Sequence, residues 1–178
     1  MNVLYTNADS LLNKKDELAA RIEEMKDEAP QIIIVTEYKP KNKRFAPEIA
    51  EYNLDGYVMS NTNPDSHGRG TMIYISSSCS ANEVKLRDQD EESLWMEVNT
   101  IDQGKMILGG VYRSPNASNE ANRRINDNIT ELCSEHNNHK IVIVGDFNMP
   151  NIEWNTGTTS NRRDHDFIET ISTFSYIN

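Results

Sequence analysis

Cysteine is scarce in this chain, and long apolar runs are missing. The only two cysteines, Cys79 and Cys133, are far apart and fit no metal-ligand spacing. We therefore expect free thiols in a reducing compartment rather than a disulfide framework. No apolar stretch approaches the roughly 18 residues that a membrane span needs. The N-terminus shows no basic start followed by an apolar segment, so we expect an intracellular, non-secreted protein with no membrane association.

Basic residues are also few. Eighteen Lys and Arg against 28 Asp and Glu give a net charge of -10. This balance counts against nonspecific nucleic-acid binding over the whole surface, because such binding rests on basic groups. It leaves room for a local basic loop, and Lys39, Lys41, Lys43 and Arg44 form one. Such a loop is either a solvated turn or a grip on a nucleic-acid backbone, and the charge pattern alone favours the turn.

The composition predicts one globular domain over residues 1–178. Hydrophobic residues make up 37% and charged residues 26%, which is typical of a folded chain of this length. Apolar patterning predicts strands over 3–6, 31–36, 57–59, 71–75, 94–98, 105–112 and 140–146. It predicts a helix that Asp9 or Ser10 can cap and that runs through about Glu28, and further helices over 47–52, 119–135 and 164–174. Strands mixed with helices in this way indicate an α/β (α+β) fold in which helices cover sheets.

The most informative segment runs from Lys140 to Pro150. A β-branched apolar run stops at Gly145, and Asp146-Phe147-Asn148 follows. Side chains two residues apart on an extended segment point to the same side, so Asp146 and Asn148 would reach one pocket. A carboxylate beside a carboxamide suits work on phosphate, since the acid can accept a proton from water and the amide can hold an oxygen.

Three other apolar strands also end in polar residues. Asn7 follows the first strand, Thr36-Glu37 the second, and Tyr112-Arg113 a later one. Open α/β sheets place their sites at such strand ends, although capping and turn formation would require the same residue types. Glu37 is an oxygen ligand suited to Mg²⁺, and Mn²⁺ would accept it too.

In their order along the chain, these motifs resemble those of the endonuclease/exonuclease/phosphatase superfamily, which includes the DNase I-like nucleases. Gly110-Val111-Tyr112-Arg113-Ser114-Pro115 and the segment from Gly145 to Trp154 look most like the endonuclease domain of LINE-type non-LTR retrotransposons. The resemblance implies a four-layer α-β-β-α sandwich of the DNase I-like type. It also implies a DNA-nicking, Mg²⁺-dependent endonuclease, associated with a reverse transcriptase and located inside the cell, with the nucleus as one candidate compartment.

The resemblance assigns roles to individual residues. Glu37 would bind the divalent metal, with Asn7 beside it. Tyr112 would hydrogen-bond the scissile phosphate, Asp146 would orient or deprotonate the attacking water, and Asn148 would hold a phosphate oxygen. Independently of the family, the guanidinium fork of Arg113 suits contact with a phosphate of the substrate.

The sequence departs from the family pattern after Asn148. Family members end with further strands that carry an aspartate and a terminal Ser-Asp-His, and nothing here matches them. Asp164-His165-Asp166 fits the acidic start of a helix with an exposed histidine better than a catalytic dyad. We therefore expect a domain that is incomplete at its C-terminus and lacks the last strands. An open sheet edge would favour association, and nicking would be very slow or absent.

Two further functions remain open at this stage. One is a phosphatase of the same superfamily, acting on inositol phosphates or of the sphingomyelinase type, and the other is a non-catalytic remnant. The histidines and Trp154 can be explained without a catalytic role. We expect His136 and His139 to form a solvated helix end rather than a zinc pair, and His67 to lie in an ordinary turn. Trp154 fits packing, or contact with substrate from a loop.

Overall fold

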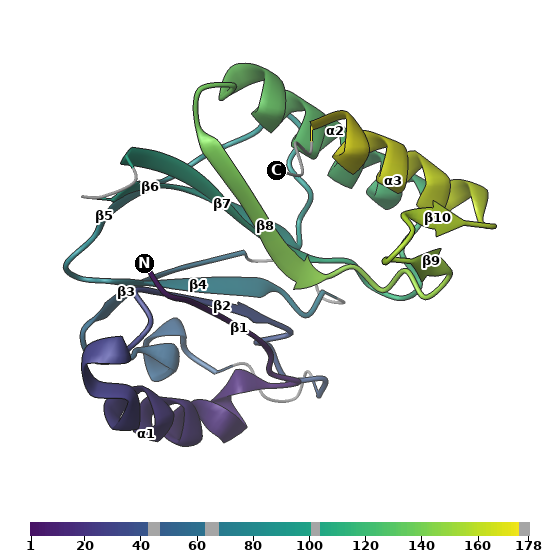
Figure 1. Ribbon diagram of the computed structural model, residues 1–178. Helices are drawn as coiled ribbons and strands as arrows, with labels where there is room; N and C mark the ends of the chain where they lie inside the picture. The colour runs from purple at the N-terminus through teal and green to yellow at the C-terminus, as the bar shows by residue number, and fades with distance from the viewer. Residues whose placement is uncertain (43–46, 63–67, 101–103, 175–178) are drawn as a thin grey trace.

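The computed structural model describes residues 1–42, 47–62, 68–100 and 104–174, arranged around two four-stranded sheets (Figure 1). The first sheet has the strand order β1-β2-β4-β3. Its strands are β1 (Val3–Asn7), β2 (Ile32–Thr36), β3 (Tyr57–Asn61) and β4 (Thr71–Ser76). β1 and β2 are parallel, so their carboxyl ends meet at one edge of the sheet.

The second sheet has the order β5-β6-β7-β8. Its strands are β5 (Ser80–Glu83), β6 (Ser93–Thr100), β7 (Gly104–Tyr112) and β8 (Lys140–Asp146). β7 and β8 are parallel, and Tyr112 pairs with Asp146 at their carboxyl ends. Within the described ranges β8 is an edge strand, where Ile141 to Asp146 are only partly buried. Association through this edge remains a prediction.

The sheets lie face to face, and helices cover their outer faces (Figure 1). α1 (Lys15–Met25) lies outside the first sheet, while α2 (Asn119–Glu135) and α3 (Arg162–Phe174) lie outside the second. This arrangement confirms the expected four-layer sandwich of helix, sheet, sheet and helix. It brings the carboxyl ends of β1 and β2 toward those of β7 and β8.

Alternation along the buried strands produces separate core layers. Ile32 and Ile34 of β2 pack between the two sheets, whereas Ile33 and Val35 pack on the α1 side. All four side chains are fully buried, which explains the continuous apolar run of this strand. A third cluster packs Trp95 of β6 against α2 and α3.

The first helix differs from the sequence prediction. The segment expected as one helix over 10–28 begins with a 3₁₀ turn at Leu11–Lys14 and ends with another at Lys26–Glu28. Ser10 does not cap it and has φ +85°. The reason is tertiary, since the backbone N–H of Ser10 donates to the carbonyl of Glu37 at 2.9 Å and so holds the chain beside the loop after β2.

Other boundaries follow the sequence pattern, with short polar elements as the exceptions. α2 has the predicted bounds, and the Ser118 hydroxyl caps it by accepting from the Ala121 N–H at 3.1 Å. The helix predicted over 47–52 is a single 3₁₀ turn at Ile49–Tyr52. β5 and the small hairpin of β9 (Ile152–Glu153) and β10 (Thr158–Thr159) were not predicted, because they lack an alternating apolar pattern.

The cysteines and the helices agree with the composition of the chain. Cys79 and Cys133 are both free thiols, as predicted. Across the described ranges, none of the helices combines the length and apolar character that a membrane crossing requires.

Candidate active site

The carboxyl ends of four strands converge where the two sheets meet. Asn7 ends β1 opposite Thr36, the last residue of β2, and Glu37 follows directly. From the other sheet, Tyr112 and Asp146 end β7 and β8 as a paired position. The sequence prediction that these polar residues share one end of the sandwich therefore agrees with the geometry.

Asn7 joins the two sheets through its carboxamide. Its Nδ2 donates to Oε1 of Glu37 at 2.9 Å and to Oδ2 of Asp146 at 3.1 Å. Its Oδ1 accepts from the backbone N–H of Asp9 at 3.2 Å, which fixes the orientation of the amide. The Asn7 amide nitrogen thus donates one hydrogen bond to each of two carboxylates, which come from different sheets.

Tyr112 presents a protonated hydroxyl to this cluster. Burial raises its pKa, and the negative charges of Glu37 and Glu92 and a hydrogen bond with Glu37 raise it further. The phenol therefore stays neutral at physiological pH and can act as a hydrogen-bond donor. A donor beside two carboxylates is suited to an oxygen that gains negative charge during a reaction.

Arg69 is a site residue that the sequence interpretation missed. One guanidinium nitrogen lies 2.9 Å from Oε2 of Glu37 and the other 2.8 Å from Oδ1 of Asp9. Its Nε also donates to the carbonyl of Lys39 at 3.0 Å. Only 12% of the Arg69 side chain is exposed, so solvent screens these contacts weakly. The available signal was an arginine between two glycines just before an apolar strand, which by itself indicates only a turn.

Asp9 extends the network toward the basic loop. Hydrogen bonds from Arg69 and then Lys41 lower the pKa of the Asp9 carboxyl to about 2. Lys41 Nζ lies 3.0 Å from Oδ1 of Asp9, so this part of the loop meets an acid beside the site. Lys43, Arg44 and His67, also considered from the sequence, lie outside the described residues.

The loop after β8 holds Asn148 in an unusual conformation. Its φ is +46°, its backbone N–H donates to Oδ1 of Asp146 at 3.2 Å, and its Nδ2 donates to the carbonyl of Arg113 at 2.8 Å. The amide therefore braces the loop, and the second hydrogen of Nδ2 is the donor that a phosphate oxygen would accept. Contact of Asn148 with phosphate stays a prediction.

Arg113 lies behind this loop rather than in front of it. The residue is 4% exposed, and its guanidinium donates to Asn122 Oδ1 at 2.6 Å and to the Asn148 carbonyl at 2.8 Å. A third, longer contact of 3.4 Å reaches the Phe147 carbonyl. This geometry gives Arg113 a positioning role for the Asp146 loop, in place of the phosphate contact suggested by its chemistry alone.

Backbone strain concentrates at the same place. Glu37 has φ +55°, and Asp9, Ser10 and Asn148 also have positive φ. Such conformations cost a non-glycine residue on the order of 1–3 kcal/mol and persist where the surrounding structure enforces them. Here they turn the Glu37 and Asn148 segments away from their strand directions at the mouth of the site.

The donor set fits a hard divalent cation. Glu37 and Asp146 supply two carboxylates, which the Asn7 amide nitrogen holds close to each other. Mg²⁺ is bound by one or two carboxylates together with waters and substrate phosphates. Glu37 forms an ion pair with Arg69 and accepts a hydrogen bond from the neutral Asn7 amide.

An open groove runs beside Asp146. Its volume is about 750 Å³, and its lining includes Tyr5, Pro115, Phe147, Asn148 and Trp154. Trp154 is 57% exposed, and its ring centroid lies 6.3 Å from that of Phe147. An exposed aromatic ring beside a polar cluster is suited to stacking or sugar contact.

The acidic stretch on α3 is separate from this cluster. Asp164 is buried and accepts from Asn151 Nδ2 at 3.3 Å, whereas His165 and Asp166 are exposed. The expected acidic helix start with an exposed histidine is confirmed.

Comparison with known proteins agrees with this architecture. The family model for endonuclease–reverse transcriptase matches residues 106–178. The solved endonuclease domain of TRAS1, a telomere-specific non-LTR retrotransposon, is 14% identical with a TM-score of 0.64, and the match covers 97% of this chain and 71% of that chain. No curated protein sequence matches the chain.

Two further solved structures share the fold. The AP endonuclease LMAP from Leishmania major is 15% identical with a TM-score of 0.65, over 96% of this chain and 65% of that one. An endonuclease/exonuclease/phosphatase family protein from Bacteroides thetaiotaomicron is 11% identical with a TM-score of 0.53, over 94% of this chain and 66% of that one. The chain therefore has the DNase I-like fold of the endonuclease/exonuclease/phosphatase superfamily, and a retrotransposon endonuclease domain is among its most similar structures.

Proposed function

We propose that this chain is a metal-dependent phosphodiester hydrolase domain that nicks DNA, of the retrotransposon endonuclease type. The observation that carries the proposal is the Asn7 carboxamide, which holds Glu37 of one sheet and Asp146 of the other at 2.9 and 3.1 Å. An asparagine that served only to cap the end of a strand would need to bind only one of these two carboxylates. Two carboxylates held together beside a protonated tyrosine are an arrangement suited to phosphate ester hydrolysis.

Each residue then has one task. Glu37, with Asn7 beside it, would hold Mg²⁺ or Mn²⁺, which when bound supplies a positive charge that polarises the phosphate. Asp146 accepts a proton from the attacking water, and Asn7 keeps its carboxylate oriented. Tyr112 donates its hydroxyl proton in a hydrogen bond to a phosphate oxygen, and Asn148 holds a second oxygen through the loop that Arg113 braces.

DNA is the proposed substrate. The names of two similar structures describe endonucleases, one of them from a retrotransposon, and the family match over 106–178 has the same character. Trp154 beside the Asp146 groove offers an aromatic surface to a base or sugar, and the Lys41 side offers positive charge next to Asp9. The net charge of -10 predicts weak binding to DNA outside this groove. With this substrate we place the protein inside the cell, with the nucleus as one candidate compartment.

The test is relaxation of supercoiled plasmid with the 178-residue chain in excess, so that slow nicking can be measured. We expect slow nicking that requires Mg²⁺ or Mn²⁺ and falls about 10²–10³-fold in Glu37→Gln, the size of loss typical for one oriented electrostatic group. Asp166→Asn, an exposed acid on α3, is the matched control and should nick as the parent chain does.

The alternatives predict different results. Release of inorganic phosphate from an inositol phosphate without plasmid nicking would replace the nuclease proposal with a phosphatase of the same fold. Absence of both activities, together with no Mg²⁺ binding by calorimetry, would identify a non-catalytic remnant. Equal nicking by the parent chain and Glu37→Gln would overturn the assigned site.

A further inference from the structure

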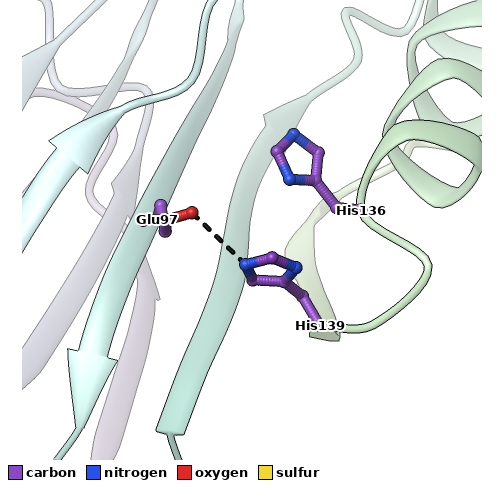
Figure 2. Close-up of side chains that lie close together, drawn as sticks. All are labelled: Glu97, His136 and His139. Carbon is purple, nitrogen blue, oxygen red and sulfur yellow. Dashed lines mark ion pairs between the residues drawn. The ribbon is translucent and has the colours of Figure 1, made fainter.

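A second polar cluster lies at the opposite end of the second sheet. It consists of Glu97 on β6, His136 at the end of α2 and His139 in the turn before β8 (Figure 2). His139 directly precedes β8 and Asp146 ends it, and this strand has seven residues. At about 3.3 Å per residue the two clusters are roughly 20 Å apart, so the second is distinct from the candidate active site.

The three side chains converge closely. One ligand atom from each residue can be chosen so that all lie within 4.8 Å of one another. The two imidazole rings meet edge to face with centroids 5.2 Å apart, and Nε2 of His139 lies 3.3 Å from Oε2 of Glu97 (Figure 2). Two imidazoles and one carboxylate form a common set of protein ligands for zinc.

His139 is incompletely partnered for a buried imidazole. Both of its ring nitrogens are shielded from solvent, and neither forms a hydrogen bond within the described part of the chain. The contact with Glu97 is close enough for an ion pair but does not meet hydrogen-bond geometry. Burying a polar group without a hydrogen bond costs free energy, so these two nitrogens indicate a partner that the protein itself does not supply.

The two oxygens of the Glu97 carboxylate contact different residues, Lys105 and His139. Lys105 Nζ contacts Oε1 at 3.1 Å, which leaves Oε2 on the side of His139. The Glu97 and His139 side chains are 19% and 18% exposed, so a small ion can reach a site that is largely screened from water. The same carboxylate can therefore keep its ion pair with Lys105 and still offer one oxygen to a metal.

We propose that Glu97, His136 and His139 bind a zinc ion, with a water molecule as the fourth ligand. Bonds of about 2.1 Å in a tetrahedron place ligand atoms about 3.4 Å apart, so side chains whose ligand atoms already lie within 4.8 Å of one another need only small movements. Imidazole ligands favour zinc over Mg²⁺, which takes oxygen. The sequence predicted a solvated helix end here because Glu97 lies far away in sequence.

The ion would tie three elements together. It would link the middle of β6 to the end of α2 and the start of β8, beside a strand that forms the edge of its sheet. Binding to the folded chain alone would stabilise it by mass action. We assign this site a structural role, independent of the proposed hydrolase function.

The chain offers a matched control on α3. His165, Asp166 and Glu169 also have ligand atoms within 4.8 Å of one another, but all three residues are exposed and come from one helix. The ring nitrogens of His165 are not among the buried atoms without a partner. Proximity is therefore similar in the two clusters, and burial with unsatisfied nitrogens distinguishes the first.

The experiment uses the full chain carrying Glu37→Gln, so that zinc at the candidate active site is suppressed. Equilibrium dialysis with zinc alone should find one bound ion, and its affinity should fall at least about 100-fold in Glu97→Gln and in His136→Ala, since even residues that only support metal ligands cost 10–100-fold. His165→Ala should change nothing. At a hundredfold excess of zinc over its dissociation constant, the unfolding midpoint should rise by roughly 5–10 °C.

Co²⁺ provides a second measurement that does not depend on stability. Intense visible absorption typical of tetrahedral Co²⁺ should appear in the Glu37→Gln chain and be lost in Glu97→Gln, with circular dichroism verifying that both are folded. Absence of zinc binding, or binding that survives Glu97→Gln and His136→Ala but is lost in His165→Ala, would overturn the proposal.

Discussion

The two polar clusters at the ends of the second sheet are built in different ways. The candidate active site takes its residues from the carboxyl ends of strands, where Asn7, Glu37, Tyr112 and Asp146 follow apolar runs. The Glu97 cluster takes one residue from the middle of a strand, one from a helix end and one from a turn. Strand ends are visible in a sequence because the apolar pattern stops there, whereas the second cluster depends on which segments lie across from each other.

The clusters also differ in how their polar atoms are satisfied. At the candidate active site, Asn7 and Arg69 provide hydrogen bonds and an ion pair to the carboxylates. In the Glu97 cluster, both nitrogens of His139 lack a hydrogen bond within the described residues. The first arrangement is organised in advance, as catalysis requires, and the second gains most from an added ion.

The largest expected effect separates the clusters by function. Asp146→Asn keeps the shape of the side chain but removes the base, so we expect nicking to fall about 10²–10³-fold. Zinc binding at the Glu97 cluster should be unchanged. Plasmid nicking and equilibrium dialysis on the same preparation measure both, and a loss of zinc affinity in Asp146→Asn would mean that the clusters are not independent.

The next prediction tests the backbone that joins the clusters. A Cβ at Gly145 would collide with the carbonyl oxygen of Val111, so alanine there must push β7 and β8 apart near Tyr112 and Asp146. We expect Gly145→Ala to lower the free energy of unfolding by about 2–3 kcal/mol, as overpacking does.

Gly157→Ala is the control for this substitution. Its Cβ would meet no atom within 4 Å, and only its φ of +63° disfavours alanine. The expected cost is about 1 kcal/mol. Urea denaturation compares the two variants, and an equal loss in both would show that the close approach at Gly145 is unimportant.

A substitution of Arg69 tests whether catalysis at the candidate active site depends on the fixed position of the Glu37 carboxylate. Arg69→Lys keeps a positive charge but cannot contact Glu37 and Asp9 with one fork. We expect a loss of about tenfold in nicking, because Glu37 loses its fixed position while remaining available to a metal. Plasmid nicking across a Mg²⁺ titration gives the measurement, with Arg21→Lys, an exposed residue on α1, as the control. Unchanged nicking would mean that the ion pairs of Arg69 have no part in catalysis.

The smallest expected effect is a pH dependence of stability from Asp9. Its pKa falls from 3.8 to about 2 because Arg69 and Lys41 favour the charged carboxylate. A lowered pKa stabilises the folded state at pH values above the unfolded pKa, and this contribution disappears as pH falls through the folded value. The unfolding midpoints of the parent chain and Asp9→Asn should therefore differ above about pH 4 and converge toward pH 2. A difference that is constant over this range would exclude the ion pairs as its source.

Much of the fold and part of the site could be predicted from the sequence. The buried strand β2 and the amphipathic α2 follow directly from apolar periodicity and a serine cap. Asn7, Glu37, Tyr112 and Asp146 converge as expected because parallel strands carry their carboxyl ends to one edge. The predicted start of the first helix was wrong, because backbone hydrogen bonds to the loop after β2 override a local capping signal at Ser10.

The sequence by itself determined the order of the apolar strands, the polar residues at their ends and the resemblance to a DNase I-like nuclease. Only the tertiary structure decided that Arg69 contacts Glu37, that Arg113 lies buried behind the Asp146 loop, and that Glu97 meets two histidines. The physical reason is the range of the interactions involved. Periodicity and capping act between neighbours along the chain, whereas hydrogen bonds, ion pairs and metal ligation act between any residues that packing brings within a few ångströms.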